Sequence, residues 1–191
     1  QKQAEGIDNM THTFDFDKIL GDLKANDLPN MDSWQPQLSG DIDIHIDAQG
    51  IWRHEGTEFK RLQIPKMFAR ILCREGDDYF LKTPVEKWRI QVADVPFYFI
   101  HLQTKETAQG VEITLVSSTQ DIITINGEHG IKLSNDSLTN EPFPYVHVRG
   151  GMYGKLSRNL YYELVNMAIV DEQQQALYID SAGQRFLLGK F

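Results

Sequence analysis

The side chains best suited to binding an anion lie in a basic stretch, residues 59–74, that contains no acidic residue. Its basic residues are Lys60, Arg61, Lys66, Arg70 and Arg74. Apolar residues recur here at helical spacing and predict an amphipathic helix from about Ile64, which would align Lys66, Arg70 and Arg74 on one face. Guanidinium groups bind phosphate through paired hydrogen bonds, and Arg61 would lie near a helix N-terminus, which also favours anions. The stretch is a candidate phosphate site, unless the chain's own acidic residues or solvent satisfy these charges.

A second pair of basic residues flanks a glycine-rich turn and a further predicted helix. Arg149 precedes two glycines, and Arg158 follows Ser157, a residue type that often caps helix N-termini. Residues 149–157 contain the glycine and lysine of a phosphate-binding loop, but such a loop needs glycine where Arg149 stands. The glycines therefore indicate a hairpin turn, and the two arginines are further candidate phosphate contacts.

Residue types used in catalysis and metal binding occur, but not in a productive pattern. Acidic residues and a histidine alternate along residues 41–47, about 7 Å apart on one strand face, so a metal ion would need further ligands. A solvated strand face explains them better. The single cysteine, Cys73, lies beside apolar helix positions and is expected in the core. His54, Glu86 or Glu163 could serve a hydrolase, but the sequence shows no nucleophile paired with a base and an orienting residue. We therefore expect no catalytic residue, metal or cofactor.

Composition and charge restrict the classes of partner. The chain has 191 residues, 19 of them basic and 27 acidic, with a formal net charge of −8. Residues 1–50 hold three lysines and ten acidic residues, so the acidity is concentrated there. This balance argues against nonspecific nucleic-acid binding and against anionic membrane surfaces. No apolar run of about 18 residues predicts a membrane span, and one cysteine fits a reducing compartment, so a cytoplasmic location is expected.

The hydrophobic pattern divides the chain into three parts. Residues 1–33 are predicted to form a polar tail and a short helix. Residues 34–95 are predicted to form a first domain, in which strand pairs flank the basic helix. Residues 96–191 are predicted to form a second, β-rich domain with one helix from about Ser157. The predicted fold class is α+β.

The order of these elements indicates that one core unit occurs twice. Ile44-His45-Ile46 precedes a glycine turn and a helix, as Val146-His147-Val148 does. An offset of 98 residues aligns Phe80-Leu81-Lys82 with Tyr178-Ile179-Asp180. Few aligned positions are identical, so chance similarity is a rival explanation. We predict two tandem copies of a β-hairpin–helix–β-hairpin core, the second enlarged by extra strands between about residues 96 and 126.

Six segments in a fixed order carry a family resemblance. The two most distinctive are Thr83-Pro84-Val85-Glu86-Lys87 and Tyr161-Tyr162-Glu163-Leu164-Val165. The others are residues 40–46, 50–56, 68–72 and 94–97. Together they resemble the bacterial domain-of-unknown-function family 1285 over about residues 34–191. The Ile64-Pro65 pair differs from the aliphatic pair expected at that helix start.

The resemblance implies several properties that the residues alone do not. It implies a duplicated core whose second domain is superficially like pleckstrin-homology folds. It also implies a ligand site at the interface of the two domains, taking a nucleotide-like molecule, and a role in signal transduction. It supplies no catalytic residues.

We therefore expect a non-catalytic regulatory module that binds a nucleotide-like or phosphorylated small molecule between its domains. The candidate ligand-binding residues are Arg61, Arg70, Arg149, Arg158 and Lys87 for phosphate, and Trp52, Trp88 and Tyr162 for stacking on a base, with core packing as the alternative role for each aromatic. The alternative function is a protein-interaction module without a small ligand, which recruits a signalling partner through a sheet edge or its basic face. A cleft lined by arginine and aromatic residues would favour the first function, and a filled interface with an exposed apolar patch the second.

Overall fold

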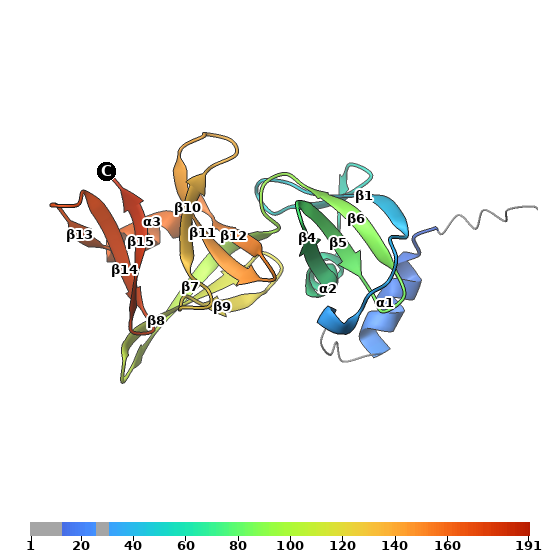
Figure 1. The fold of residues 1–191 in the computed structure, drawn as a ribbon, viewed down its shortest axis with the longest axis horizontal. Coiled ribbons are helices and arrows are strands. Elements are labelled where there is room, and N and C mark those ends of the chain that lie inside the picture. The colour runs from blue at the N-terminus through green and yellow to red at the C-terminus, as the bar shows by residue number, and fades with distance from the viewer. Residues whose placement is uncertain (1–12, 26–30) are drawn as a thin grey trace, which may run out of the picture.

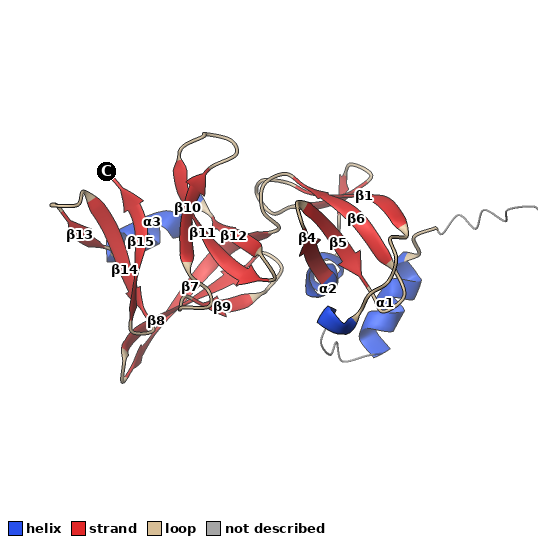
Figure 2. Cartoon of the chain, in the orientation of Figure 1, coloured by secondary structure: helices blue, strands red, loops and turns tan. Residues whose placement is uncertain are grey.

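The structure, a computed structural model, describes residues 13–25 and 31–191. The predicted polar tail lies almost wholly outside the described residues. The described chain is mostly β, with few helices and curled sheets, and it forms two halves that lie side by side along the long axis of the molecule (Figures 1 and 2).

The N-terminal half is built on one six-stranded sheet. Its helical elements are α1 (Phe16–Ala25), the 3-10 helix η1 (Met31–Ser33) and α2 (Gln63–Ile71). Its strands are β1 (Gly40–Ile46), β2 (Trp52–His54), β3 (Thr57–Glu58), β4 (Leu72–Glu75), β5 (Asp78–Lys82) and β6 (Lys87–Val92). The strand order is β3-β2-β1-β6-β5-β4, and β1 and β6 are parallel.

Local sequence patterns explain the core of this half. Strand β1 alternates as predicted, so that Ile42, Ile44 and Ile46 are buried while the residues between them are exposed. Helix α2 buries Phe68 and three other residues against this layer, and Pro65 lies in its first turn, where a missing N–H does no harm.

The predicted basic helix is too long, and its aligned face is wrong. Helix α2 ends at Ile71, because Leu72 adopts extended backbone and pairs with Leu81 of β5. Arg74 therefore lies on strand β4 and does not share a helix face with Lys66 and Arg70.

The C-terminal half contains a second six-stranded sheet, a three-stranded sheet and one helix. Its elements are β7 (Phe97–Thr107), β8 (Gly110–Ser117), β9 (Ile122–Thr124), β10 (Ile131–Asn135), β11 (Pro142–Arg149), β12 (Met152–Leu156), α3 (Arg158–Met167), β13 (Ile169–Asp171), β14 (Ala176–Ser181) and β15 (Gln184–Lys190). The sheet orders are β10-β11-β12-β7-β8-β9 and β13-β14-β15. The predicted cap of α3 is confirmed, since the Ser157 hydroxyl accepts a hydrogen bond from the Leu160 N–H.

Hairpin, helix and strand follow in the same order in both halves, but their pairing differs. In the first half β1 pairs with β6, which closes the unit into one sheet. In the second half β12 pairs instead with β7, and the last three strands form their own sheet among the described residues. Figure 1 shows the long β7–β8 hairpin passing beneath β14 and β15, where the Ile113 N–H donates to the Ser181 hydroxyl at 2.9 Å.

The two halves meet closely at a turn that follows β1. Gly50, at φ +75°, lies against β7, where a Cβ atom added to it would be 2.4 Å from the Tyr98 Cβ. Nearby, the Tyr145 hydroxyl donates to the Asp94 carboxylate at 2.8 Å. Burial and this carboxylate raise the pKa of Tyr145, so the phenol stays protonated and keeps donating.

None of the helices in the described residues is both long and apolar enough to cross a membrane.

Candidate functional site: an interdomain pocket

A pocket of about 370 Å³ lies between the two halves and is called the interdomain pocket below. The N-terminal half contributes residues from η1, β4 and the end of β5, and the C-terminal half contributes the β11–β12 turn. The lining residues are Met31, Asp32, Leu72, Cys73, Arg74, Glu75, Lys82, Arg149, Gly150 and Met152. Its side chains combine three cations with two acidic groups and apolar or sulfur-containing walls.

Arg149 clamps the two halves together beside this pocket. Its Nη2 donates to the carbonyl oxygens of Ala69 at 2.5 Å and Leu72 at 3.3 Å, and its guanidinium lies 5.4 Å from the centre of the Phe97 ring. The two carbonyls are at the C-terminal end of α2, where the helix dipole favours a cation. Burial lowers the pKa of Arg149, and the nearby Asp121 acts in the opposite direction. Arg149, a predicted phosphate contact, thus already donates to two backbone carbonyls through Nη2.

Replacing Arg149 by alanine should lower the free energy of unfolding by about 2–3 kcal/mol, because charged hydrogen bonds are lost and the α2 carbonyls lose their partner. Urea denaturation measures this change. Arg158→Ala is the matched control, since Arg158 is exposed and its loss should change stability by less than about 0.5 kcal/mol. Equal stabilities of the two variants would contradict the clamp.

Arg74 forms a second clamp from the N-terminal half. Its Nη1 donates to the Gly151 carbonyl at 2.8 Å, and its Nε donates to the Gly76 carbonyl at the same distance. The guanidinium also lies 3.7 Å from Asp77 and 5.6 Å from the Tyr79 ring centre. Both arginines of the pocket thus donate hydrogen bonds to backbone carbonyls of the protein itself.

Lys82 is the cation that has no such partner. The residue is 9% exposed, its ammonium is open to solvent in the pocket, and the described residues offer this ammonium no hydrogen bond or ion pair. The nearby acid Glu75 is taken by Lys87, whose Nζ donates to Glu75 Oε2 at 2.9 Å and lies 4.9 Å from the Phe80 ring centre. Asp32 lines the same pocket but does not pair with Lys82.

Cys73 shares the pocket wall with Lys82 and is partly exposed. Burial raises the pKa of the Cys73 thiol, and the charge of Lys82 acts against this rise without reversing it. The thiol is therefore protonated at neutral pH, unlike an activated nucleophile. The pocket has the groups to bind an anion rather than to carry out acyl or phosphoryl transfer.

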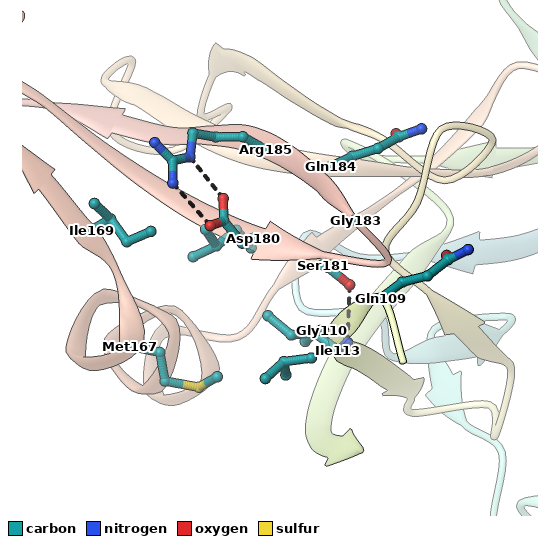
Figure 3. A pocket seen from close by; sticks show the side chains of 12 residues that line it. Gln109, Gly110, Ile113, Met167, Ile169, Asp180, Ser181, Gly183, Gln184 and Arg185 are labelled. Atoms are coloured by element: carbon teal, nitrogen blue, oxygen red, sulfur yellow. Dashed lines mark hydrogen bonds and ion pairs between the residues drawn. The ribbon is translucent and has the colours of Figure 1, made fainter. Parts of the chain in front are cut away.

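Other hollows offer weaker anchoring. One of them, of about 570 Å³, lies between β8, the end of α3 and the β14–β15 hairpin. Figure 3 shows that its charged groups face each other: Arg185 donates to both Asp180 oxygens, at 2.7 and 2.9 Å. The Ser181 hydroxyl is already engaged by Ile113. This hollow has no uncompensated charge to attract an anion.

The predicted ligand-binding residues do not converge on one place. Arg149 lines the interdomain pocket, and Lys87 contacts it only through Glu75. Arg61 precedes α2 and Arg70 lies on it, both exposed and outside the pocket lining. Arg158 instead lines a smaller hollow of about 150 Å³.

The predicted stacking aromatics also lie elsewhere. Trp52 and Trp88 are 3% and 4% exposed and belong to the hydrophobic core, where Trp52 contacts Phe68 and Trp88 contacts Phe14. Tyr162 is exposed on α3 and does not line the interdomain pocket. These placements correspond to core and surface positions, and none of the three rings is available to a ligand in this pocket.

Sequence reasoning missed Lys82 as a site residue. A signal was present, since Lys82 ends the apolar run Tyr79-Phe80-Leu81 just before a turn with Pro84. A lysine at the end of a strand is usually solvated, whereas Lys82 is 9% exposed and lines a pocket together with residues of the second half. Among residues 13–25 and 31–191, no group of three or more His, Cys, Asp or Glu side chains is placed to hold a metal ion.

Comparisons with known proteins agree with a two-part chain. The model of the DUF1285 N-terminal domain, a domain of unknown function, matches residues 29–95, and that of the DUF1285 C-terminal domain matches residues 96–188. A crystal structure of a DUF1285 family protein from Silicibacter pomeroyi DSS-3 is similar at 30% identity and a TM-score of 0.78, covering 90% of this chain and 94% of that one. Another, from Shewanella baltica OS155, is 31% identical with a TM-score of 0.52, covering 64% of this chain and 90% of that one.

The chain belongs to the DUF1285 family, as the resemblance predicted. No curated protein matches it.

Proposed function

We propose that this protein is a non-catalytic regulatory module that binds a small anionic ligand, such as a phosphorylated molecule, in the interdomain pocket and acts in signal transduction. The observation that carries this proposal is Lys82, a largely buried lysine whose ammonium is open to solvent in the pocket and has no anionic partner among the described residues. An ammonium that opens into a pocket and has no anionic partner can form a charge-assisted hydrogen bond with an anion that enters the pocket.

The size and position of the pocket suit this role. Its volume of about 370 Å³ falls in the range of about 300–1,000 Å³ that is usual for small-molecule sites. Arg74 and Arg149 line the same pocket and tie its walls together across the two halves. A ligand held there contacts both halves and stabilises the arrangement in which they are clamped, which links binding to a change that a partner protein can detect.

Replacing Lys82 by methionine should raise the free energy of unfolding by about 1 kcal/mol or less, because an apolar chain of similar length replaces a largely buried lysine whose charge has no partner. Lys66→Met is the matched control, because Lys66 is exposed on α2 outside the pocket and its replacement should change stability by less than about 0.5 kcal/mol. Urea denaturation of both variants measures the difference. A Lys82→Met protein less stable than the wild type would show that the ammonium has an internal partner.

A thermal-shift screen tests binding itself. The probes are inorganic phosphate, AMP, cyclic AMP and alkyl phosphates, added to the wild type, Lys82→Met and Lys66→Met. An anion at about 100 times its Kd stabilises by about 2.7 kcal/mol, which is about 5–10 °C in Tm for a chain of this length. The shift should be lost in Lys82→Met and kept in Lys66→Met. A flat response to every anion would overturn the proposal.

A protein-interaction module without a small ligand is the second candidate. It is favoured by exposed apolar side chains near the end of α3, namely Met167, Ile169 and Val170, at 42, 40 and 56% exposure. Strand β13 is an edge strand of the three-stranded sheet, and an edge can accept a further strand. Val170→Lys would abolish binding of a signalling partner here and leave anion binding unchanged.

Three broader properties belong to the same proposal. The shared order of hairpin, helix and strands supports two tandem copies of one core within an α+β fold, in the domains 34–95 and 96–191. A curled sheet with one helix supports a likeness of the second to pleckstrin-homology folds. The single cysteine supports a cytoplasmic location, and the acidic net charge supports a protein that does not use nucleic acid or membranes as partners.

A further inference from the structure

We infer that the ligand of the interdomain pocket is an aliphatic anion, with a phosphate or carboxylate head on Lys82 and a hydrocarbon body, rather than a nucleotide. This inference rests on the proposed function of the same pocket and specifies its ligand. It departs from the nucleotide-like molecule expected from the sequence.

The walls of the pocket are better suited to an alkyl chain than to a nucleotide base. Its described lining includes no aromatic side chain, and its uncharged side chains are Met31, Leu72, Cys73 and Met152. A nucleotide needs a face on which its base can stack, and aromatic rings usually supply it. Thioether groups are flexible and polarisable and fill the irregular space around an alkyl chain. The pocket therefore fits methylene groups better than a planar base.

The nearby aromatic rings cannot supply the missing face. Trp88 is 4% exposed and packs edge-on against Phe14, with ring centroids 5.5 Å apart. Phe80 is 5% exposed, with the Lys87 ammonium and the Arg89 guanidinium 4.9 and 5.6 Å from its ring centre. Tyr79 faces the Arg74 guanidinium. Each ring is already in contact with another group.

The charged groups place the head of the ligand. The hydrogen bonds of Arg149 and Arg74 go to backbone carbonyls, whereas the Lys82 ammonium is open to solvent in the pocket and has no partner among the described residues. A lysine ammonium is a compact point charge that accepts either a phosphate or a carboxylate. The acidic Asp32 and Glu75 on the same lining disfavour a head with more than one phosphate, so a carboxylate or a single phosphate monoester, which carries at most two charges, fits best.

Isothermal titration of the full chain tests this inference. The ligands are ethyl, butyl and hexyl phosphate, hexanoate, AMP and uncharged hexanol, each titrated into the wild type, Lys82→Met and Lys66→Met. In the wild type, affinity should rise about fourfold for each added methylene until the pocket is filled. Hexyl phosphate should then bind more tightly than AMP, and hexanol should bind at least about tenfold more weakly. The comparison of hexyl phosphate with hexanoate identifies the head.

A wall variant tests the body of the ligand separately from its head. Met31 is half-buried on η1, so Met31→Ala should leave the fold intact and weaken hexyl phosphate about three- to tenfold, with ethyl phosphate almost unchanged. AMP binding more tightly than hexyl phosphate, and lost in Lys82→Met, would overturn the aliphatic inference while supporting the proposed function. Binding of no anion, or binding that Lys82→Met does not weaken, would overturn both.

Discussion

Replacing Asp136 by alanine should lower the free energy of unfolding by about 3 kcal/mol, one of the largest losses that a single substitution in this chain can cause. Asp136 forms an ion pair with Lys155, and the side chains are 8% and 9% exposed. Its other carboxylate oxygen accepts hydrogen bonds from the Leu138 and Thr139 N–H groups at 2.7 and 3.1 Å. Removing one partner of a buried pair leaves the other charge without compensation, which costs about 3–5 kcal/mol, and the small hollow beside this pair places it at the lower end.

The pH dependence of this loss identifies its cause. Burial alone would raise the pKa of Asp136, but the hydrogen bonds from Lys155 and the two backbone N–H groups outweigh burial and lower the pKa below its ordinary value of 3.8. A carboxyl whose pKa is lower when folded contributes its stability above about pH 4 and loses it as the pH falls through the folded value. The wild type and Asp136→Ala should therefore differ at pH 7 and converge in strong acid.

The exposed Asp180–Arg185 pair is the control for this prediction. Asp180→Ala should change stability little, because solvent screens this pair even though its distances are short. Urea denaturation at neutral and acid pH measures all three proteins. A loss for Asp136→Ala no larger than that for Asp180→Ala would contradict the role of the buried pair.

Replacing Gly50 by alanine should lower the free energy of unfolding by about 2–5 kcal/mol and weaken the junction between the halves. Gly50 is at φ +75°, which costs a residue with a Cβ atom about 1–2 kcal/mol. The new Cβ would also be 2.4 Å from the Tyr98 Cβ, which cannot withdraw without moving β7. Overpacking of this kind adds about 1–3 kcal/mol.

Gly56→Ala separates the two causes. Gly56 has a similar φ of +80°, but nothing lies within 4 Å of the position of its Cβ atom. The free energy of unfolding of this variant should therefore fall only by the cost of the positive φ, about 1–2 kcal/mol. Urea denaturation measures both, and hydrogen exchange of β7 amides reports on the junction. An equal decrease in the free energy of unfolding of the two variants would show that the close approach of Gly50 to Tyr98 does not contribute to the effect of Gly50→Ala.

Elements that are determined by local pattern could be predicted from the sequence. Strand β1 has a period of two, and α3 begins at a serine that caps it, so both are where the sequence places them. Strand β4 was missed because the apolar period of α2 continues into Leu72, and only pairing with Leu81 forces extended backbone there. Strand β10 was missed because it is largely polar and is held by β11.

The candidate site was less predictable than the fold, for a physical reason. The basic residues predicted an anion-binding site. Which basic side chain has no hydrogen-bond or ion-pair partner, however, depends on residues that are distant in the sequence. Arg149 bonds a carbonyl 80 residues away, and Lys87 takes Glu75 across the sheet. These contacts leave Lys82 as the cation of the pocket that has no partner among the described residues, and no local sequence pattern distinguishes it from a solvated lysine. The family resemblance implied a ligand site between the domains but named no residue for it.

The central claim, that an anion binds beside Lys82 in the interdomain pocket, is tested most directly through Cys73. It is the single cysteine of the chain and lines the same pocket, so its alkylation reports on that place alone. Because burial raises the pKa of the thiol, the reaction with iodoacetamide is measured in mildly alkaline buffer and followed by intact mass. Each variant is compared with itself, with and without hexyl phosphate, since Lys82 itself influences the thiol.

At about ten times its Kd, hexyl phosphate should slow alkylation of the wild type about tenfold, because only the free protein reacts. Lys66→Met should show the same protection, and Lys82→Met should show none. An unchanged alkylation rate in the wild type at concentrations where titration shows binding, or equal protection of Lys82→Met, would contradict the placement of the anion beside Lys82.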